Sequence, residues 1–140
     1  MQQSTLTRQS QAIESKRIYA KVIADSISPT GVRLTTMECQ FPRFILAQVN
    51  THRAFSRNSA SSRAIPIHKR IQEVEDDPYI PISMGSNRAG MQAGPVVSIQ
   101  QKWEAEVAWR AGCANAIYAA RKMAESGVHK EIVNRLLEPF

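Results

Sequence analysis

Long apolar runs are missing from this sequence. None of its 140 residues belongs to an uninterrupted apolar stretch near the roughly 20 residues that a membrane-spanning helix needs. The N-terminal sequence MQQSTLTRQSQAIESKR also lacks the apolar core of a secretory signal peptide. We therefore expect a soluble, cytoplasmic protein without a membrane partner.

Cysteine and histidine are scarce and scattered. The only cysteines, Cys39 and Cys113, form no CxxC pattern, and His52, His68 and His129 do not recur at a helical spacing of three or four. Metal ligands usually show such spacings, and disulfides are rare in cytoplasmic proteins. The sequence predicts two small buried cysteines and no metal site.

Acidic residues are absent between Cys39 and Gln72. Six of the 18 basic residues lie there, and the other twelve match the 12 acidic residues, so this segment carries the whole net charge of +6. An electropositive segment in a neutral background is typical of an anion-binding site. A solvated basic face is the alternative, although such a face usually mixes acids with bases. The six residues are Arg43, Arg53, Arg57, Arg63, Lys69 and Arg70.

The first half of the chain predicts a β-hairpin and a short helix. Residues 1–16 are polar and aperiodic, which indicates a loose arm. Two β-branched and aromatic runs, 18–27 and 31–41, flank the turn Ser28-Pro29-Thr30-Gly31 and favour antiparallel strands. Pro42 then opens a helix that we expect to end near Asn50.

The second half predicts helices joined by a surface connection. A helical pattern over 64–74 stops at Asp76-Asp77-Pro78, and residues 78–95 are rich in proline and glycine. The strongest helix of the chain spans about 96–126 and is closed by Gly127 as a left-handed cap. Another amphipathic helix begins at Val128.

The long helix has two apolar stripes, so two of its sides need cover. A partner subunit or a missing part of the domain could supply that cover, and the protein's own chain is an equally good candidate. From the predicted strands and helices together, we expect the fold class α+β: one domain over 17–140, with a short antiparallel sheet flanked by helices. One stripe consists of Trp103, Val107, Ala114, Ile117 and Tyr118, and the other of Ala105, Trp109, Cys113, Ala116, Ala120 and Met123.

Residues 51–63, THRAFSRNSASSR, combine the chemistry of a phosphate site. Guanidinium groups hold phosphates through paired charge-assisted hydrogen bonds, and serine hydroxyls with loop amides complete the cradle. The segment has no apolar period, which predicts a structured loop. No catalytic triad, Walker loop or GxGxxG pattern occurs, so no catalytic residue is assigned.

The spacing of this segment resembles the signature of flavin-dependent thymidylate synthases, RHRxxSxNxxSxR. The resemblance covers about residue 18 to the end and corresponds to roughly the first half of the family's domain. It implies the fold of the thymidylate synthase-complementing proteins. The matching positions are His52, Arg53, Ser56, Asn58, Ser61 and Arg63.

The resemblance implies an activity and its cofactors. The family converts dUMP to dTMP, with methylenetetrahydrofolate as the one-carbon donor and NADPH as the reductant of a bound FAD. It also implies a homotetramer in which several subunits build each site.

Residue roles are likewise implied by the resemblance. Flavin would contact Thr51, His52 and Arg53, with Ser28 as a loose match to a flavin-contacting threonine. Ser59 would lie where flavin and nucleotide meet. The dUMP nucleotide would be held by Gln48, Ser61, Ser62 and Arg63.

The sequence departs from the family at two points. Thr51 replaces the first arginine of the signature, and the sequence stops at Phe140, before the second half of the family's domain. A complete site is then expected to need further subunits or a complementing polypeptide.

Two alternatives to an active synthase follow. One is a degenerate or partial homologue that binds nucleotide or flavin without turnover. The other is a basic nucleic-acid-binding module, which is less favoured because only Phe44 and Phe55 offer base stacking near the basic segment.

Overall fold

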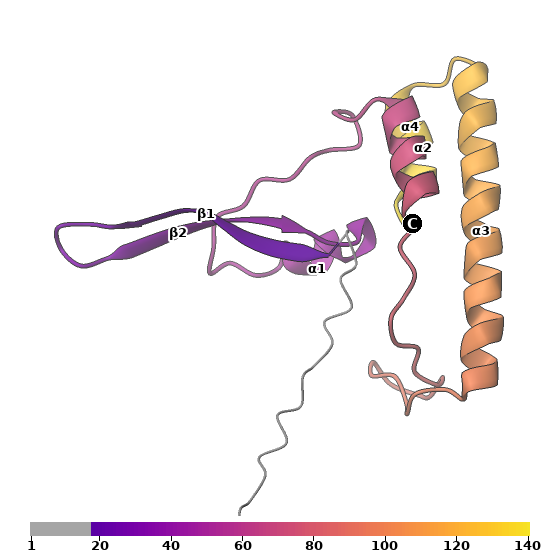
Figure 1. The fold of residues 1–140 in the computed structure, drawn as a ribbon, viewed down its shortest axis with the longest axis horizontal. Helices are drawn as coiled ribbons and strands as arrows, with labels where there is room; N and C mark the ends of the chain where they lie inside the picture. Colours follow the sequence, from indigo (N-terminus) through magenta and orange to yellow (C-terminus); the bar gives the residue numbers. More distant parts are fainter. Residues whose placement is uncertain (1–17) are drawn as a thin grey trace, which may run out of the picture. The chain divides into compact units, whose positions relative to one another are not determined.

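The computed structural model describes residues 18–140 and shows a mixed α/β chain (Figure 1). One two-stranded antiparallel sheet and one long helix are its main elements, as the sequence predicts. The described chain divides into two compact units, one ending at Phe41 and the other running from Pro42 to Phe140. The predicted arm over residues 1–16 lies outside the described residues, and the single domain over 17–140 stays a prediction.

The first unit is a β-hairpin. Strand β1 (Tyr19–Ile27) pairs with β2 (Arg33–Gln40), and the register shifts between Val22 and Ala24. Gly31 has a φ of 83°, the left-handed conformation that glycine adopts without strain. The predicted strands and turn are therefore confirmed.

Side-chain pairs on the hairpin are polar and exposed. Asp25 accepts hydrogen bonds from Arg33 and Thr35, with the Thr35 hydroxyl at 2.9 Å. These bonds hold the pKa of Asp25 below its ordinary value, and the bond from Arg33 has the largest effect. On the opposite end of the pairing, the Tyr19 hydroxyl donates to Glu38 at 2.7 Å, which raises the pKa of Tyr19.

Cys39 is exposed on β2, so the prediction that it is buried is wrong. Every residue of both strands is exposed. A two-stranded sheet is a single layer and by itself covers neither of its faces. The apolar character of cysteine therefore does not translate into burial here.

The first two helical segments of the second unit each begin directly after a proline. A short 3₁₀ turn, η1 (Arg43–Ile45), leads into α1 (Leu46–Val49), and Pro42 precedes them. Helix α2 (Ile67–Asp76) follows Pro66 in the same way. Both prolines sit one position before the first helical residue, within the usual variation of helix boundaries.

Helix α3 (Ile99–Glu125) dominates the second unit. It starts at a capping box in which Ser98 and Gln101 satisfy each other's backbone N–H groups. It ends before Gly127, whose φ of 76° confirms the predicted left-handed cap. Within the preceding connection, Gly85 and Val96 form an isolated antiparallel bridge.

The C-terminal segment is helical but divided. Helix α4 (Lys130–Val133) passes into the 3₁₀ turn η2 (Asn134–Leu137) instead of continuing as one amphipathic helix. Arg70 of α2 donates to the carbonyl oxygens of Leu137 at 3.0 Å and Phe140 at 3.2 Å. These bonds tie the C-terminal residues to α2.

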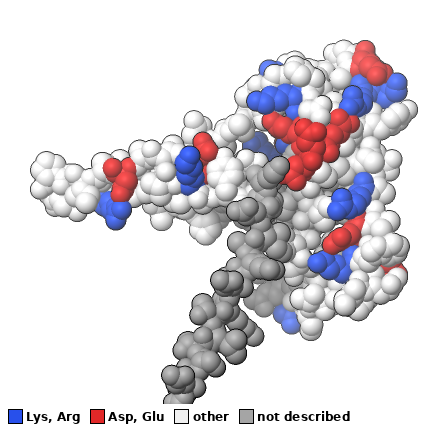
Figure 2. Space-filling view, in the orientation of Figure 1, with Lys and Arg blue, Asp and Glu red and all other residues white. Residues whose placement is uncertain are grey.

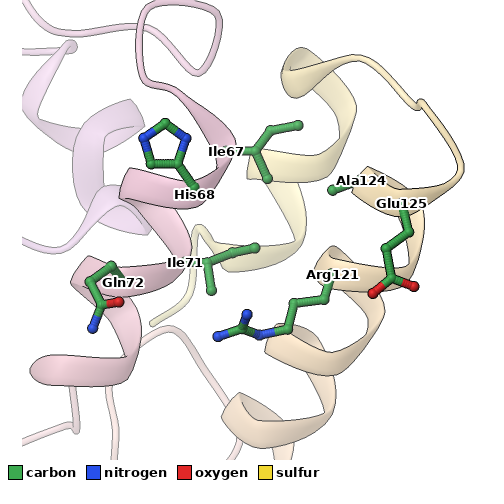
Figure 3. A pocket seen from close by; sticks show the side chains of 7 residues that line it. All are labelled: Ile67, His68, Ile71, Gln72, Arg121, Ala124 and Glu125. Carbon is green, nitrogen blue, oxygen red and sulfur yellow. The ribbon is translucent and has the colours of Figure 1, made fainter.

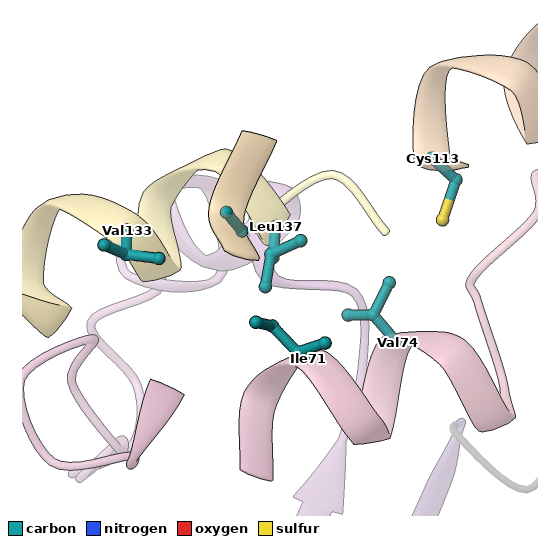
Figure 4. Packing of buried hydrophobic residues seen from close by; sticks show 6 residues of the cluster. Ile71, Val74, Cys113, Val133 and Leu137 are labelled. Carbon is teal, nitrogen blue, oxygen red and sulfur yellow. The ribbon is translucent and has the colours of Figure 1, made fainter. Parts of the chain in front are cut away.

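The core of the second unit lies between α2, α3 and the C-terminal turns (Figure 4). Cys113 is buried there, as predicted, together with the other small residue Ala120. The α3 stripe that contains Cys113 faces this core. In the other stripe, Trp103, Val107 and Tyr118 are exposed, but Ile117 packs against the core. The buried residues are Ile71, Val74, Cys113, Ala120, Val133 and Leu137.

Among the described elements, no helix combines the length and apolar character needed to span a bilayer.

Candidate anion-binding loop

Residues 51–63 form an irregular loop between α1 and α2, as the sequence predicts. Arg57 holds the first half of this loop from within. Its Nε donates to Asn50 Oδ1 at 2.9 Å, its Nη1 to the carbonyl of His52 at 2.6 Å, and its Nη2 to the carbonyl of Asn50. A third carbonyl, that of Phe55, lies 3.3 Å from Nη1. Arg57 therefore acts as a support of the loop, and its donors are committed to the backbone.

The second half of the loop is held by residues from outside it. Arg43 Nη1 donates to the carbonyl of Ala60 at 2.6 Å. Asn134 Nδ2 donates to the carbonyls of Ser62 at 2.8 Å and Ile65 at 2.9 Å. Asn134 is only 3% exposed, so these two bonds form where water does not compete for them.

The residues expected to contact flavin follow α1 directly. The Thr51 hydroxyl donates to the carbonyl of Gln48 at 2.7 Å, which commits its proton to the end of the helix. His52 and Phe55 lie nearly parallel, with ring centroids 6.3 Å apart and an interplanar angle of 21°. Arg53 is exposed and has no hydrogen-bond or ion-pair partner among residues 18–140. Thr51, His52 and Arg53 thus present one aromatic pair and one unpaired cation.

The residues expected to contact nucleotide phosphate lie at the other end of the loop. Ser59 and Ser61 are exposed, and Ser62 is half-buried. Arg63 Nη2 donates to Glu131 Oε1 at 2.7 Å, while its side chain remains 69% exposed. The guanidinium is anchored on one side and open to solvent on the other.

Gln48 and Ser28 occupy different settings. Gln48 is exposed on α1, three residues before the motif. Ser28 belongs to the hairpin unit, where its hydroxyl lies 2.8 Å from that of Thr30 and accepts from the N–H of Val32 at 3.1 Å. The loop residues and Gln48 are therefore parts of one unit, and Ser28 is part of the other.

Carboxylates distant in sequence partly neutralise the basic segment. Glu131 pairs with Arg63, and Glu138 Oε1 lies 3.8 Å from Arg43 Nε. Figure 2 shows basic and acidic side chains next to one another over the helical unit. Because Arg63 donates to it, Glu131 has a pKa below its ordinary value. The acid-free segment of the sequence is thus not an acid-free surface.

The hollow between α2 and α3 is separate from the loop (Figure 3). It has a volume of about 320 Å³ and an apolar floor of Ile67, Ile71 and Ala124. Arg121 at its rim donates to Glu75 at 2.6 Å. None of the residues assigned to flavin or nucleotide lines this hollow.

Within residues 18–140, no group of three or more His, Cys, Asp or Glu residues could hold a metal ion.

Comparisons with family models, with curated proteins and with solved structures find no match to this chain.

Three residues that shape the loop are not evident from the motif. Asn134 and Glu131 follow it by about 70 positions in sequence, and Arg43 precedes it. No spacing rule links side chains so far apart in a single sequence. A buried asparagine in an amphipathic segment was the one available sign, because a buried amide needs partners.

Proposed function

We propose that loop 51–63 binds a nucleotide phosphate and a flavin, and that the protein acts in the flavin-dependent conversion of dUMP to dTMP. One observation carries this proposal. Arg43, Arg57 and Asn134 hold the backbone of the loop, while the loop side chains assigned to the ligands, except that of Ser62, stay exposed. One set of residues thus holds the loop in place and another set is left to contact the ligand, which is the arrangement that a binding site needs.

The phosphate end of the site is built around Arg63. Its guanidinium is anchored by Glu131 and retains donors on its exposed side. A phosphate can accept two parallel bonds from such a group, and the exposed hydroxyls of Ser59 and Ser61 add further donors. Ser62 contributes mainly through its carbonyl, which ties the loop to Asn134.

The flavin end is built around His52 and Arg53. The near-parallel rings of His52 and Phe55 offer a flat aromatic surface suited to a planar ring system. Arg53 is a cation available to the anionic part of the cofactor. Thr51 retains acceptor lone pairs, since its proton is directed to Gln48.

The chemistry itself belongs to the cofactors. Bound FAD, reduced by NADPH, would supply the hydride, and methylenetetrahydrofolate would supply the carbon. The chain's part is to orient dUMP by its phosphate beside the flavin. With Arg53 and Arg63 as its exposed guanidinium groups, a single loop supplies only part of the contacts, and other subunits or a complementing polypeptide would supply the rest.

The proposal is tested by spectroscopy of the purified protein. We expect FAD to bind, and its visible absorption spectrum to change when dUMP is added. Lys69→Ala should bind both ligands as the unchanged protein does, because Lys69 is an exposed cation of the same basic segment outside the motif. This variant therefore controls for a general effect of positive charge. Salt-dependent binding of single-stranded oligonucleotides without any uptake of flavin would overturn the proposal. Flavin and dUMP binding without turnover would support the binding function and refute catalysis by this chain alone.

A further inference from the structure

An apolar stripe runs along the side of α3 that the core does not use. Ile99 is 90% exposed, Trp103 62%, Val107 47% and Tyr118 65%. Ala114 lies between the last two and is also exposed. The spacings of four, four, seven and four residues place all five on one side of a helix with 3.6 residues per turn.

The other side of α3 is already occupied. The Trp109 indole donates to the carbonyl of Tyr79 at 2.7 Å and packs edge-on against Phe140, with centroids 5.5 Å apart. Cys113 and Ala120 continue this side into the core. The exposed stripe is therefore additional apolar surface and not a misplaced core face.

The size of the stripe is close to what an interface needs. Its large side chains expose on the order of 500 Å² of apolar surface, since each aromatic residue alone can bury 150–250 Å². A standard interface buries roughly 800 Å² on each partner, and isolated apolar patches on monomers rarely exceed a few hundred Å². Neighbouring polar side chains would supply the remainder.

We propose that two copies of this chain pair through this stripe, with their α3 helices antiparallel. The two-fold axis passes between residues 108 and 109. In this register Ile99 lies opposite the partner's Tyr118, and Trp103 lies opposite the partner's Ala114. Val107 lies next to the axis, opposite the partner's Arg110, and the small Ala114 lets the helix axes approach to about 8–10 Å. The interface is self-complementary, as a two-fold dimer requires.

Charge favours the same register. Glu106 lies at the edge of the stripe next to Ile99, and Arg110 lies beside it, between Ile99 and Trp103 around the helix. In a symmetric antiparallel pair, like edges meet. Glu106 then lies one residue away from the position directly opposite the partner's Arg110, within reach of its long side chain, and this contact occurs twice. Arg110 has no ion-pair or hydrogen-bond partner within residues 18–140, and Glu106 is only weakly engaged, 3.8 Å from Lys102 Nζ. Both charges are therefore available to a second copy.

This pairing is independent of the proposed flavin and nucleotide sites, none of whose residues lies on α3. Its first test is the molar mass of the full chain by light scattering and sedimentation equilibrium at micromolar concentration. We expect a dimer or an even multiple of it. Trp103→Glu is expected to halve that mass, whereas Ile82→Glu should leave it unchanged, because Ile82 is 54% exposed and lies outside the stripe. Far-UV circular dichroism checks that each variant keeps its helices.

A charge exchange tests the register. Glu106→Arg and Arg110→Glu each place like charges opposite one another and are expected to weaken association at least fivefold. The double variant Glu106→Arg/Arg110→Glu restores opposite charges and should recover most of the loss.

Cross-linking gives an independent measurement. In a Cys39→Ser background, Val107→Cys lies near the axis and should be joined to its copy by a short bis-maleimide. Ala108 is also exposed but points to another side of α3, so a cysteine in Ala108→Cys should not be joined. A monomeric wild-type chain, whatever else covers the stripe, would overturn the proposal. So would an assembly that Trp103→Glu leaves intact, or a double charge variant that associates no better than the single variants.

Discussion

Arg63 and Glu131 form an ion pair of 2.7 Å although 68 residues separate them in sequence. The pair joins the end of the loop to the start of α4. It gives the guanidinium a defined position while leaving 69% of the side chain exposed. Arg63 is thus both a structural contact and the principal phosphate ligand that we propose.

Replacing Arg63 tests the phosphate assignment. Arg63→Ala is expected to abolish dUMP binding, at a cost of about 2–5 kcal/mol for removing a charged hydrogen-bonding partner. Isothermal titration calorimetry measures the affinity, and Lys69→Ala is the control for a general loss of positive charge. Unchanged dUMP affinity in Arg63→Ala would show that the assignment is wrong.

Glu131 competes with phosphate for the same guanidinium. Glu131→Gln keeps the size of the side chain but removes its charge, so we expect dUMP to bind more tightly, with a small gain because the pair is exposed to solvent. The same titration measures this gain. Weaker binding in Glu131→Gln would instead mean that Glu131 acts chiefly by positioning Arg63.

The pKa of Glu131 reports the pair directly. Its carboxyl group should titrate below its ordinary value of 4.5, and Arg63→Gln should raise the midpoint. Because the folded-state pKa is lowered, the stabilisation is present above the unfolded pKa and is lost as pH falls through the folded one. NMR titration of the side-chain carboxyl carbon measures both midpoints. Equal midpoints in the two proteins would exclude the pair in solution.

Asn134 is expected to stabilise the loop. Asn134→Ala leaves the carbonyls of Ser62 and Ile65 without their donor, which should lower the free energy of unfolding by about 1–3 kcal/mol. Chemical denaturation measures the change. Asn115→Ala is the matched control, since Asn115 is exposed on α3 and should be nearly neutral.

The two cysteines should differ in reactivity. Cys39 is exposed and Cys113 is 5% exposed, so a thiol reagent should modify one group quickly and the other only on unfolding. Cys39→Ser should remove the fast phase of labelling. A fast phase that survives this substitution would place Cys113 in contact with solvent.

Local patterns predicted most of the elements. The strands around the Ser28–Gly31 turn, the irregular loop and α3 with its Gly127 cap all depend on residues close in sequence. Burial was less predictable, because Cys39 lies in a hairpin that covers neither of its own faces. The division of the last helix into α4 and η2 was not visible in its apolar period, which runs through both.

The residues of the candidate loop could be predicted from the sequence, but the residues that hold the loop in place could not. Motif spacing selects His52, Arg53, Ser61 and Arg63, and the structure brings these into one loop. Charge counting along the chain, by contrast, missed Glu131, because an acid far away in sequence can still reach a basic segment in space. The charge around a segment cannot be predicted from the sequence alone where folding brings distant residues next to it.

Arg57 directs its guanidinium to two backbone carbonyls of its own loop and to the carbonyl and side chain of Asn50, just before the loop. The loop therefore has its shape before any ligand arrives. Binding to such a preorganised segment loses little conformational entropy, so more of the contact energy appears as affinity. An arginine that never touches the ligand would in this way strengthen every contact that its neighbours make.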